Sequence, residues 1–353
     1  NRKTNLAPVS SQAQVVHQRL FVVDLHADAL LWNRNLLKRG TYGHVDLPRL
    51  QQGNVALQVF ASVTQVPLGL NFERNDAKRD LVTLLATLGG WPPLTRTSRL
   101  PRALYMAEKL RGFIAQSHGQ MILIQSASDL DELVAQRQGD PRIVGALLAL
   151  EGVHALEGRI ENLDALYDAG FRMIGLHHFF DNEAGGSAHG VERGGLTQFG
   201  RELVQRIQQK HMALDLAHSS PPVLANALSI TTAPVFVSHT GLCGTCDNSR
   251  NLTDAQVRAV AATGGVMGIA LFKHAVCGTT VDDTVRAMQY GANLVGVDHI
   301  ALGSDFDGAV TTPIDSAHLA QVTESLMQHG FGKSEIAKIM GGNARRVLKQ
   351  ILP

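Results

Sequence analysis

The sequence predicts an α/β fold, a (β/α)8 barrel of the TIM type. Eight short apolar runs rich in β-branched residues recur along the 353-residue chain, and stretches with helical spacing of apolar residues separate them. This alternation is typical of βα units around a parallel sheet, and eight strands close a barrel. Metal-binding types of side chain follow several of the runs, at the barrel end where active sites lie.

The predicted strands show continuous rather than alternating hydrophobicity, as expected for strands covered on both faces. They are Phe21–Leu25, Val55–Val63, Ile143–Leu150, Phe171–Leu176, Met212–Ala217, Pro234–Ser238, Gly265–Leu271 and His299–Gly303. A ninth run, Met121–Ile124, is interpreted as an extra strand or a strand-like insert.

Helix signals lie between the strands. Thr253 to Gln256 reads as a capping box, and Gly264 stands where a helix would end. The segment 67–120 exceeds one crossover helix and contains two helical stretches, Leu81–Leu88 and Ala103–Gln116. We therefore expect a single elaborated barrel domain, residues 1–353, with a helical insertion at about 67–120.

The composition limits the function classes. A net charge of +1 gives no dense positive field, so nucleic acid and anionic membranes are not expected partners. No apolar run approaches the roughly 20 residues of a membrane-spanning helix. The chain begins with Asn1, so a bacterial cytoplasmic protein and an exported one with its N-terminal signal or anchor removed both stay open. A homodimer is a hypothesis.

The three cysteines are too few for a disulfide-dependent scaffold. Cys243 and Cys246 form a CxxC pair, and Cys277 stands alone. A structural zinc site would need further ligands nearby, so loop thiols or one disulfide are the favoured interpretation.

Polar residues appear where the first and third barrel strands end. His26 and Asp28 are two apart and project to the same side of an extended chain, so they can share one metal ion. Glu151 directly follows an uncharged run, where burial of a carboxylate is costly unless a cation compensates. Asp24, one step deeper, is expected to orient a metal-bound group or to pack within the barrel.

Later strands add further groups of this kind. The fifth and sixth end in His218 and His239, whose neutral imidazoles are good zinc ligands. The fourth ends in His177 and His178, and the eighth continues into Asp305 and Asp307. Each group alone also fits a chance pair, a capping histidine or a turn. Five strands ending in metal-compatible groups together favour a metal site.

Taken in order, these motifs resemble the membrane (renal) dipeptidase family of zinc metallopeptidases, in its bacterial form. The matching residues are His26-x-Asp28, Leu150-Glu151-Gly152, Leu216-Ala217-His218-Ser219, Ser238-His239, Arg250-Asn251-Leu252-x-Asp254, Gly303-Ser304-Asp305-Phe306-Asp307-Gly308, Gly185-Gly186-Ser187-Ala188-His189-Gly190 and Met340-Gly341-Gly342-Asn343. They extend from Val22 to about Leu348.

The resemblance implies a site with two Zn²⁺ ions. Glu151 bridges them, His26 and Asp28 complete one ion, and His218 and His239 complete the other. A water bridging such ions is acidified to hydroxide near neutral pH, and this hydroxide attacks the peptide carbonyl.

The resemblance also implies roles for three other residues. Asp305 takes the proton of the attacking water and delivers it to the leaving amine, and His178 stabilises the oxyanion. Arg250 grips the free carboxylate of a dipeptide, L-Xaa-L-Xaa or L-Xaa-D-Xaa. From the sequence alone, a surface salt bridge of Arg250 with Asp247 or Asp254 is the commoner alternative.

Two departures and two rivals accompany the resemblance. The chain end does not support the lipid anchor of animal members, and residues around Leu271-Phe272 differ from theirs. A sibling amidohydrolase acting on N-acyl amino acids or cyclic amides shares the metal chemistry, although no strand ends in the lysine of the carboxylated-lysine type. A catalytically inactive, metal-stabilised binding protein is the other rival, and the presence of Asp305 and His178 speaks against it.

Overall fold

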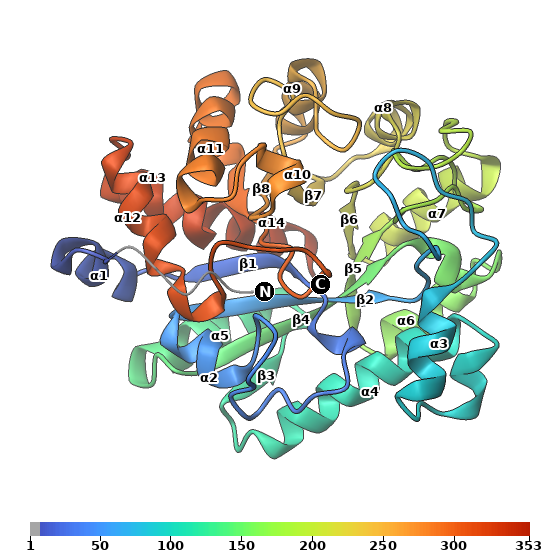
Figure 1. The fold of residues 1–353 in the computed structure, drawn as a ribbon, viewed down its shortest axis with the longest axis horizontal. Helices are drawn as coiled ribbons and strands as arrows, with labels where there is room; N and C mark the ends of the chain where they lie inside the picture. The colour runs from blue at the N-terminus through green and yellow to red at the C-terminus, as the bar shows by residue number, and fades with distance from the viewer. Residues whose placement is uncertain (1–7) are drawn as a thin grey trace.

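The computed structural model describes residues 8–353, so Asn1 lies outside the described residues. Within 8–353 the chain forms nine parallel strands, eight of which succeed one another in the order β1-β2-β4-β5-β6-β7-β8-β9 (Figure 1). They are β1 (Val22–Ala27), β2 (Val55–Val63), β4 (Val144–Glu151), β5 (Phe171–Gly175), β6 (Ala213–Asp215), β7 (Phe236–Thr240), β8 (Val266–Ile269) and β9 (Ile300–Leu302). The predicted (β/α)8 barrel is confirmed.

The ring of strands is nearly closed between β9 and β1. Ala27 forms a parallel bridge with Phe306, and the Asp28 amide donates to the Phe306 carbonyl at 2.9 Å. The extra run also forms a strand, β3 (Met121–Leu123), which pairs with β4 outside the ring.

Helices surround the strands, as Figure 1 shows. They are α1 (Ser11–Gln18), α2 (Leu47–Gln52), α3 (Leu81–Leu88), α4 (Leu100–Gln116), α5 (Ala127–Gly139), α6 (Asn162–Asp168), α7 (Gln198–Gln209), α8 (Pro221–Ile230), α9 (Asp254–Ala262), α10 (Lys273–Val276), α11 (Val281–Val295), α12 (Ala320–Gln328), α13 (Lys333–Ala337) and α14 (Asn343–Ile351). The predicted capping box begins α9: the Gln256 side chain accepts from the Thr253 amide at 2.8 Å. Gly264 follows this helix with φ +80°.

The segment between β2 and β3 carries α3 and α4, which coincide with the two helical stretches expected there. The buried guanidinium of Arg102 on α4 ties this segment to the barrel. It donates to the Thr64 carbonyl after β2 at 2.6 Å and pairs with Asp80, the N-cap of α3. A buried charge of this kind is costly unless it is paired and hydrogen-bonded, and here both conditions are met.

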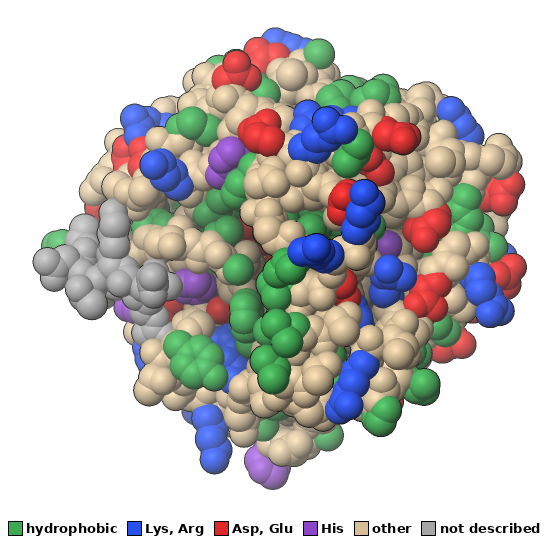
Figure 2. Space-filling model, turned by 45° about the vertical axis from the view of Figure 1, so that its right-hand side comes forward, with side chains coloured by type: hydrophobic (Ala, Val, Ile, Leu, Met, Phe, Trp, Pro, Cys, Tyr) green, Lys and Arg blue, Asp and Glu red, His purple; other side chains and the backbone are tan. Residues whose placement is uncertain are grey.

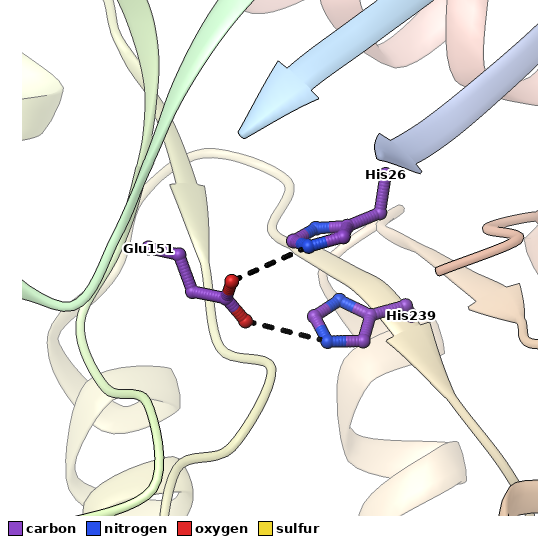
Figure 3. A group of neighbouring side chains, drawn as sticks. All are labelled: His26, Glu151 and His239. Carbon is purple, nitrogen blue, oxygen red and sulfur yellow. Dashed lines mark ion pairs between the residues drawn. The ribbon is translucent and has the colours of Figure 1, made fainter. Parts of the chain in front are cut away.

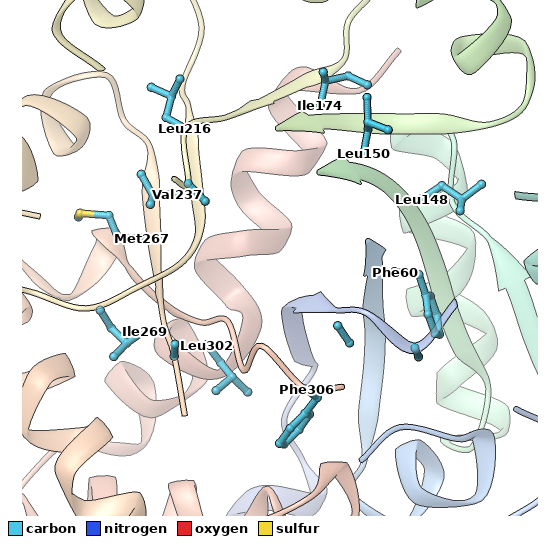
Figure 4. Packing of buried hydrophobic residues seen from close by; sticks show 14 of the residues in the cluster. Phe60, Leu148, Leu150, Ile174, Leu216, Val237, Met267, Ile269, Leu302 and Phe306 are labelled. Carbon is cyan, nitrogen blue, oxygen red and sulfur yellow. The ribbon is translucent and has the colours of Figure 1, made fainter. Parts of the chain in front are cut away.

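Every residue of the eight barrel strands is buried, which matches their continuous hydrophobicity. Large apolar side chains from successive strands pack together, among them Phe60, Leu148, Ile174 and Leu302 (Figure 4). A second group of buried apolar residues continues from the strands into α5 and α14. This packing makes the barrel a rigid support for groups at the strand ends.

The outer surface is mixed in charge. On the face shown in Figure 2, lysine and arginine side chains alternate with aspartate and glutamate side chains. No helix within residues 8–353 is long and apolar enough to cross a bilayer.

Candidate metal and active site

The strand ends bring the predicted polar residues to one mouth of the barrel. His26 is the second-last residue of β1, Glu151 is the last residue of β4, and His239 lies in β7. His178, His218 and Asp305 each come three residues after their strands, β5, β6 and β9. Because the carboxyl ends of parallel strands meet on one face, residues far apart in sequence converge here.

The carboxylate of Glu151 faces His26 and His239, with one oxygen toward each ring (Figure 3). Its Oε2 lies 3.4 Å from His26 Nε2, and its Oε1 lies 3.0 Å from His218 Nε2 and 3.4 Å from His239 Nε2. His26 Nε2 also lies 3.4 Å from Asp28 Oδ1. All of these side chains are buried.

The cluster has the properties of a cation site. His26 Nε2, Asp28 Oδ1 and Glu151 Oε2 are buried without a hydrogen-bond partner among the described residues, an arrangement that costs about 1–3 kcal/mol per group. His218 Nε2 and His239 Nε2 lie only 2.9 Å apart and face the same carboxylate oxygen. A divalent cation would satisfy these nitrogen and oxygen donors, so the residues fit a metal.

Within residues 8–353, three overlapping groups could hold an ion. They are His26 with Glu151 and His239, Glu151 with His178 and His218, and His26 with Asp28 and Asp305. Glu151 and His26 are shared between groups, and His178 and Asp305 lie among the expected ligands. The five expected metal ligands therefore come together with both expected catalytic residues.

Burial and mutual charge shift the titration of these groups. Burial raises the pKa of Glu151, but the nearby His178 and His26 and the hydrogen bond from His218 outweigh it, so this pKa lies well below its ordinary value. Burial, Asp28 and Glu151 raise the pKa of Asp305 well above its ordinary value, against the opposing charges of His26 and Arg250.

The histidines opposite Glu151 are held neutral, the form that binds metal. Burial lowers the pKa of His218 and of His239 well below the ordinary value, and the charge of Arg250 adds to this. His218 and Asp305 also have left-handed backbones, each with φ +60°. Non-glycine residues rarely adopt this conformation, which is concentrated at functional sites.

Arg250 is buried beside the cluster and forms no salt bridge with Asp247 or Asp254. Its guanidinium donates to the His239 carbonyl, and its Nε has no hydrogen-bond partner among the described residues. Asp254 instead accepts from the Tyr290 hydroxyl at 2.8 Å. The surface alternative for Arg250 is therefore wrong, because the loop after β7 folds inward over the barrel mouth.

A disulfide fixes the same loop. Cys246 is bonded to Cys277, which directly follows α10, with a Cα–Cα distance of 5.3 Å. Cys243 is free, and its thiol lies 3.3 Å from the Asn251 carbonyl oxygen. The CxxC pair is thus split, and the bridge joins the loop after β7 to the loop after β8.

Asp307 has a structural place next to the site. It accepts from the His44 amide at 2.7 Å and pairs with Arg34, so it ties the loop after β1 to the loop after β9. His177 points away from Glu151, with its Nδ1 3.2 Å from the Ser219 hydroxyl, and burial lowers its pKa to about 4.

Sequence reasoning missed two buried partners of the ligands, Asp215 and Ser238. The Ser238 hydroxyl lies 2.6 Å from Asp215 and 2.9 Å from His239 Nδ1. A charged residue inside the apolar run Met212–Ala217 was the available signal, since a buried carboxylate needs partners.

A surface pocket of about 730 Å³ lies beside the loops that carry Arg250 and Asp305. Asp247 and Asn248, just before Arg250, form one wall, and residues 309–311, just after Asp305, form another. Phe72, Phe272 and His274 complete it, with the Phe72 and His274 rings stacked at 3.9 Å.

Known proteins resemble the chain over nearly its full length. The family model for membrane dipeptidase, peptidase family M19, matches residues 10–352. A dipeptidase of Aspergillus oryzae, aclJ, is 25% identical over 362 residues, covering 97% of this chain and 80% of that protein. An uncharacterised Klebsiella pneumoniae protein encoded in the 5′ region of pqqA is 32% identical over 259 residues, covering 69% of this chain and 93% of that protein.

A solved structure shares the fold. The metallopeptidase of Rhodobacter sphaeroides, bound to a phosphinate mimic of the dipeptide L-Ala-D-Ala, superposes with a TM-score of 0.78 at 23% identity. The match covers 94% of this chain and 99% of that one. With the buried donor set at the barrel mouth and the family match from end to end, the chain belongs to the membrane dipeptidase family, peptidase family M19, and is a metal-dependent dipeptidase.

Proposed function

We propose that this dipeptidase holds two divalent ions, Zn²⁺ in the native enzyme, and cleaves free dipeptides at the barrel mouth. The observation that carries the proposal is the convergence of buried imidazole nitrogens and carboxylate oxygens on Glu151. Zinc is favoured because it binds mixed nitrogen and oxygen donors of this kind.

The proposed ligand sets follow from which side of Glu151 each donor faces. Glu151 would be shared by both ions: His26 and Asp28 would hold one on the side of Oε2, and His218 would help to hold the other on the side of Oε1. His239 also faces Oε1 and completes the second set. When bound, such ions lower the pKa of a coordinated water and polarise the carbonyl of the scissile bond.

Asp305 is proposed as the proton carrier. It is within reach of the cluster, in one group with His26 and Asp28, but the two ligand sets are complete without it. In the proposed reaction its carboxylate takes the proton of the attacking water and returns it to the leaving amine.

His178 is proposed to bind the oxyanion of the tetrahedral intermediate. Its Nδ1 faces the Gln65 carbonyl at 3.3 Å, and a carbonyl can only accept, so Nδ1 carries a proton. Its Nε2 faces the cluster, 3.8 Å from Glu151 Oε1. Nε2 is therefore the ring nitrogen of His178 that would face an oxyanion.

Arg250 is proposed to bind the free carboxylate of the substrate. Its buried guanidinium has an unpartnered Nε among the described residues, and the fork geometry suits a carboxylate. Burial lowers the pKa of Arg250, while Asp305 and Glu151 counteract this, so the group stays cationic. Binding of the free carboxylate by Arg250 would limit the substrate to two residues.

A hydrolysis screen of the zinc-loaded enzyme tests the proposal. The substrates are L-Xaa-L-Xaa and L-Xaa-D-Xaa dipeptides, tripeptides, N-acetyl dipeptides and N-acyl amino acids, with Asp305→Asn as the matched inactive control. We include D-residues because the Rhodobacter sphaeroides relative binds a mimic of L-Ala-D-Ala. Turnover confined to free dipeptides supports the proposal. Turnover of N-acyl amino acids, with dipeptides untouched, would overturn it.

A further inference from the structure

Ser238 on β7 contacts ligands of both proposed ions. Its buried hydroxyl lies 2.9 Å from His239 Nδ1, 3.4 Å from His26 Nδ1 and 2.6 Å from Asp215 Oδ2. The two imidazoles lie side by side, with ring centroids 3.8 Å apart. One hydroxyl therefore touches the outer nitrogen of a ligand from each set.

The hydrogen-bond inventory fixes the direction of these contacts. Asp215 Oδ1 is already occupied by the amides of Ser238, at 2.8 Å, and Ala217, at 3.1 Å. Its Oδ2 is left for the hydroxyl of Ser238. A carboxylate only accepts, so the single hydroxyl proton goes to Asp215 and the two oxygen lone pairs remain for the imidazoles.

This direction sets the tautomer of both histidines. An acceptor at Nδ1 requires a proton on Nδ1 of His26 and of His239, which in the neutral, metal-binding ring leaves each Nε2 with a free lone pair. Those same Nε2 atoms face Glu151, each at 3.4 Å. On both rings, the hydrogen bond at Nδ1 therefore leaves Nε2, the nitrogen that faces Glu151, available to bind a metal ion.

We propose that Ser238, oriented by Asp215, is a positioning residue that couples the two halves of the metal centre. The inference rests on the proposed two-ion function and extends it to residues that touch no metal. Outer partners of ligating histidines commonly fix the tautomer and ring orientation, and their loss costs about 10- to 100-fold in metal affinity. Here one hydroxyl does so for both ions.

Two other buried serines show that the contact is specific. Ser304 bonds to Asp24 in a similar pair, but it reaches only the backbone carbonyl of His26, at 3.0 Å. Ser62 on β2 has a hydroxyl with no hydrogen-bond partner among the described residues. Ser62→Ala therefore removes a buried strand hydroxyl without touching the ligands, and it is the matched control.

The experiment is a Co²⁺ titration of the metal-free protein, followed by visible absorption, with bound metal counted after gel filtration. The variants are wild type, Ser238→Ala, Ser62→Ala and Asp215→Asn, each checked for folding by circular dichroism. In Asp215→Asn the side-chain oxygen of Asn should keep accepting from the backbone amides of Ser238 and Ala217. Its NH2 group then faces the Ser238 hydroxyl and donates to one of the oxygen lone pairs that the imidazoles use. This second variant keeps the test valid if Ser238→Ala does not fold.

We expect two equivalents of Co²⁺ in wild type and in Ser62→Ala. In Ser238→Ala both equivalents should bind about 10- to 100-fold more weakly with altered absorption bands, and Asp215→Asn should shift in the same direction. Unchanged affinities in Ser238→Ala and Asp215→Asn, with two ions still bound by wild type, overturn this inference alone. Weakening of only one equivalent overturns the coupling. Fewer than two equivalents in wild type overturns the two-ion proposal itself.

Discussion

At the scale of single residues, the chemistry depends on charged groups buried close together. Glu151, Asp28 and Asp305 are all buried in one cluster, and like charges at such distances repel unless cations lie between them. Burial raises the pKa of Asp305 well above its ordinary value, and the neighbouring Asp28 and Glu151 carboxylates add to this. A carboxyl with a raised pKa is suited to exchange protons, whereas the charges of His178 and His26 and the hydrogen bond from His218 hold the pKa of Glu151 low.

Asp305→Asn should keep metal and lose turnover. The amide retains the size of the side chain but cannot take a proton, so kcat should fall about 10²- to 10⁴-fold while metal content stays at the wild-type level. Steady-state kinetics and metal analysis on the same preparation measure both quantities. Near-normal kcat in this variant would contradict the role of Asp305.

Arg250→Lys should weaken the binding of substrates that carry a free carboxylate. Loss of the fork removes a charge-assisted hydrogen bond of about 1.5–3 kcal/mol, so KM for a dipeptide should rise about 10- to 100-fold. The corresponding dipeptide amide lacks the carboxylate, so its inhibition constant as a competitor of dipeptide hydrolysis should change little. If the KM of the dipeptide and the inhibition constant of its amide rise equally, the substitution acts through the His239 carbonyl and not through the substrate carboxylate.

At the scale of elements, the site depends on how loops are fastened at the barrel mouth. The loop after β7 carries Arg250 and is clamped by the Cys246–Cys277 disulfide and by Asn251, whose amide donates to the Ala275 carbonyl at 2.8 Å. The loop after β9 carries Asp305 and is tied down through Asp307. Both loops leave short strands, so these ties, and not the sheet, set their positions.

Cys277→Ser should destabilise the enzyme, and Cys243→Ser should not. The disulfide spans 31 residues, and loss of such a crosslink typically costs about 2–4 kcal/mol because the unfolded chain gains freedom. Guanidinium unfolding under non-reducing conditions measures the difference, and KM for dipeptides should rise as the Arg250 loop loosens. Equal stability of the two variants would indicate that the bridge is absent in the protein as prepared.

At the scale of the whole molecule, stability and metal binding are linked. The barrel buries several donors that lack partners among residues 8–353, and bound cations would supply those partners only in the folded state. A ligand that binds the folded state alone stabilises it by mass action. The metal-free enzyme should therefore fold but unfold more easily.

Removal of metal should lower Tm by about 5–10 °C. A metal at 100 times its Kd contributes about 2.7 kcal/mol, so two ions contribute about 5.4 kcal/mol, and each kcal/mol shifts Tm by about 1–2 °C in a chain of 353 residues. Differential scanning calorimetry with a chelator, and then with Zn²⁺ restored, measures the shift. Glu151→Gln is the control, because loss of the bridging carboxylate should lower occupancy of both ions and remove most of the response to Zn²⁺. A full response in that variant would contradict bridging.

The barrel and the polar residues at its mouth were predictable from local patterns in the sequence. Continuous apolar runs such as Val55–Val63 can only be covered on both faces, and the carboxyl ends of parallel strands must meet, so His26, Glu151 and His239 were predictable as neighbours. The capping box at Thr253 was equally local, because its hydrogen bonds join residues three apart.

Which of these residues are in contact could not be predicted from the sequence, because the contacts join different strands and loops. The burial of Arg250, the choice of Cys277 as the partner of Cys246, and the contact of one Ser238 hydroxyl with two imidazoles all depend on distances between different strands and loops. Strand periodicity fixes the side to which a residue points, but the register and bulges between strands set cross-strand distances. Hydrogen-bond direction follows from those distances, and the tautomers of His26 and His239 follow from it.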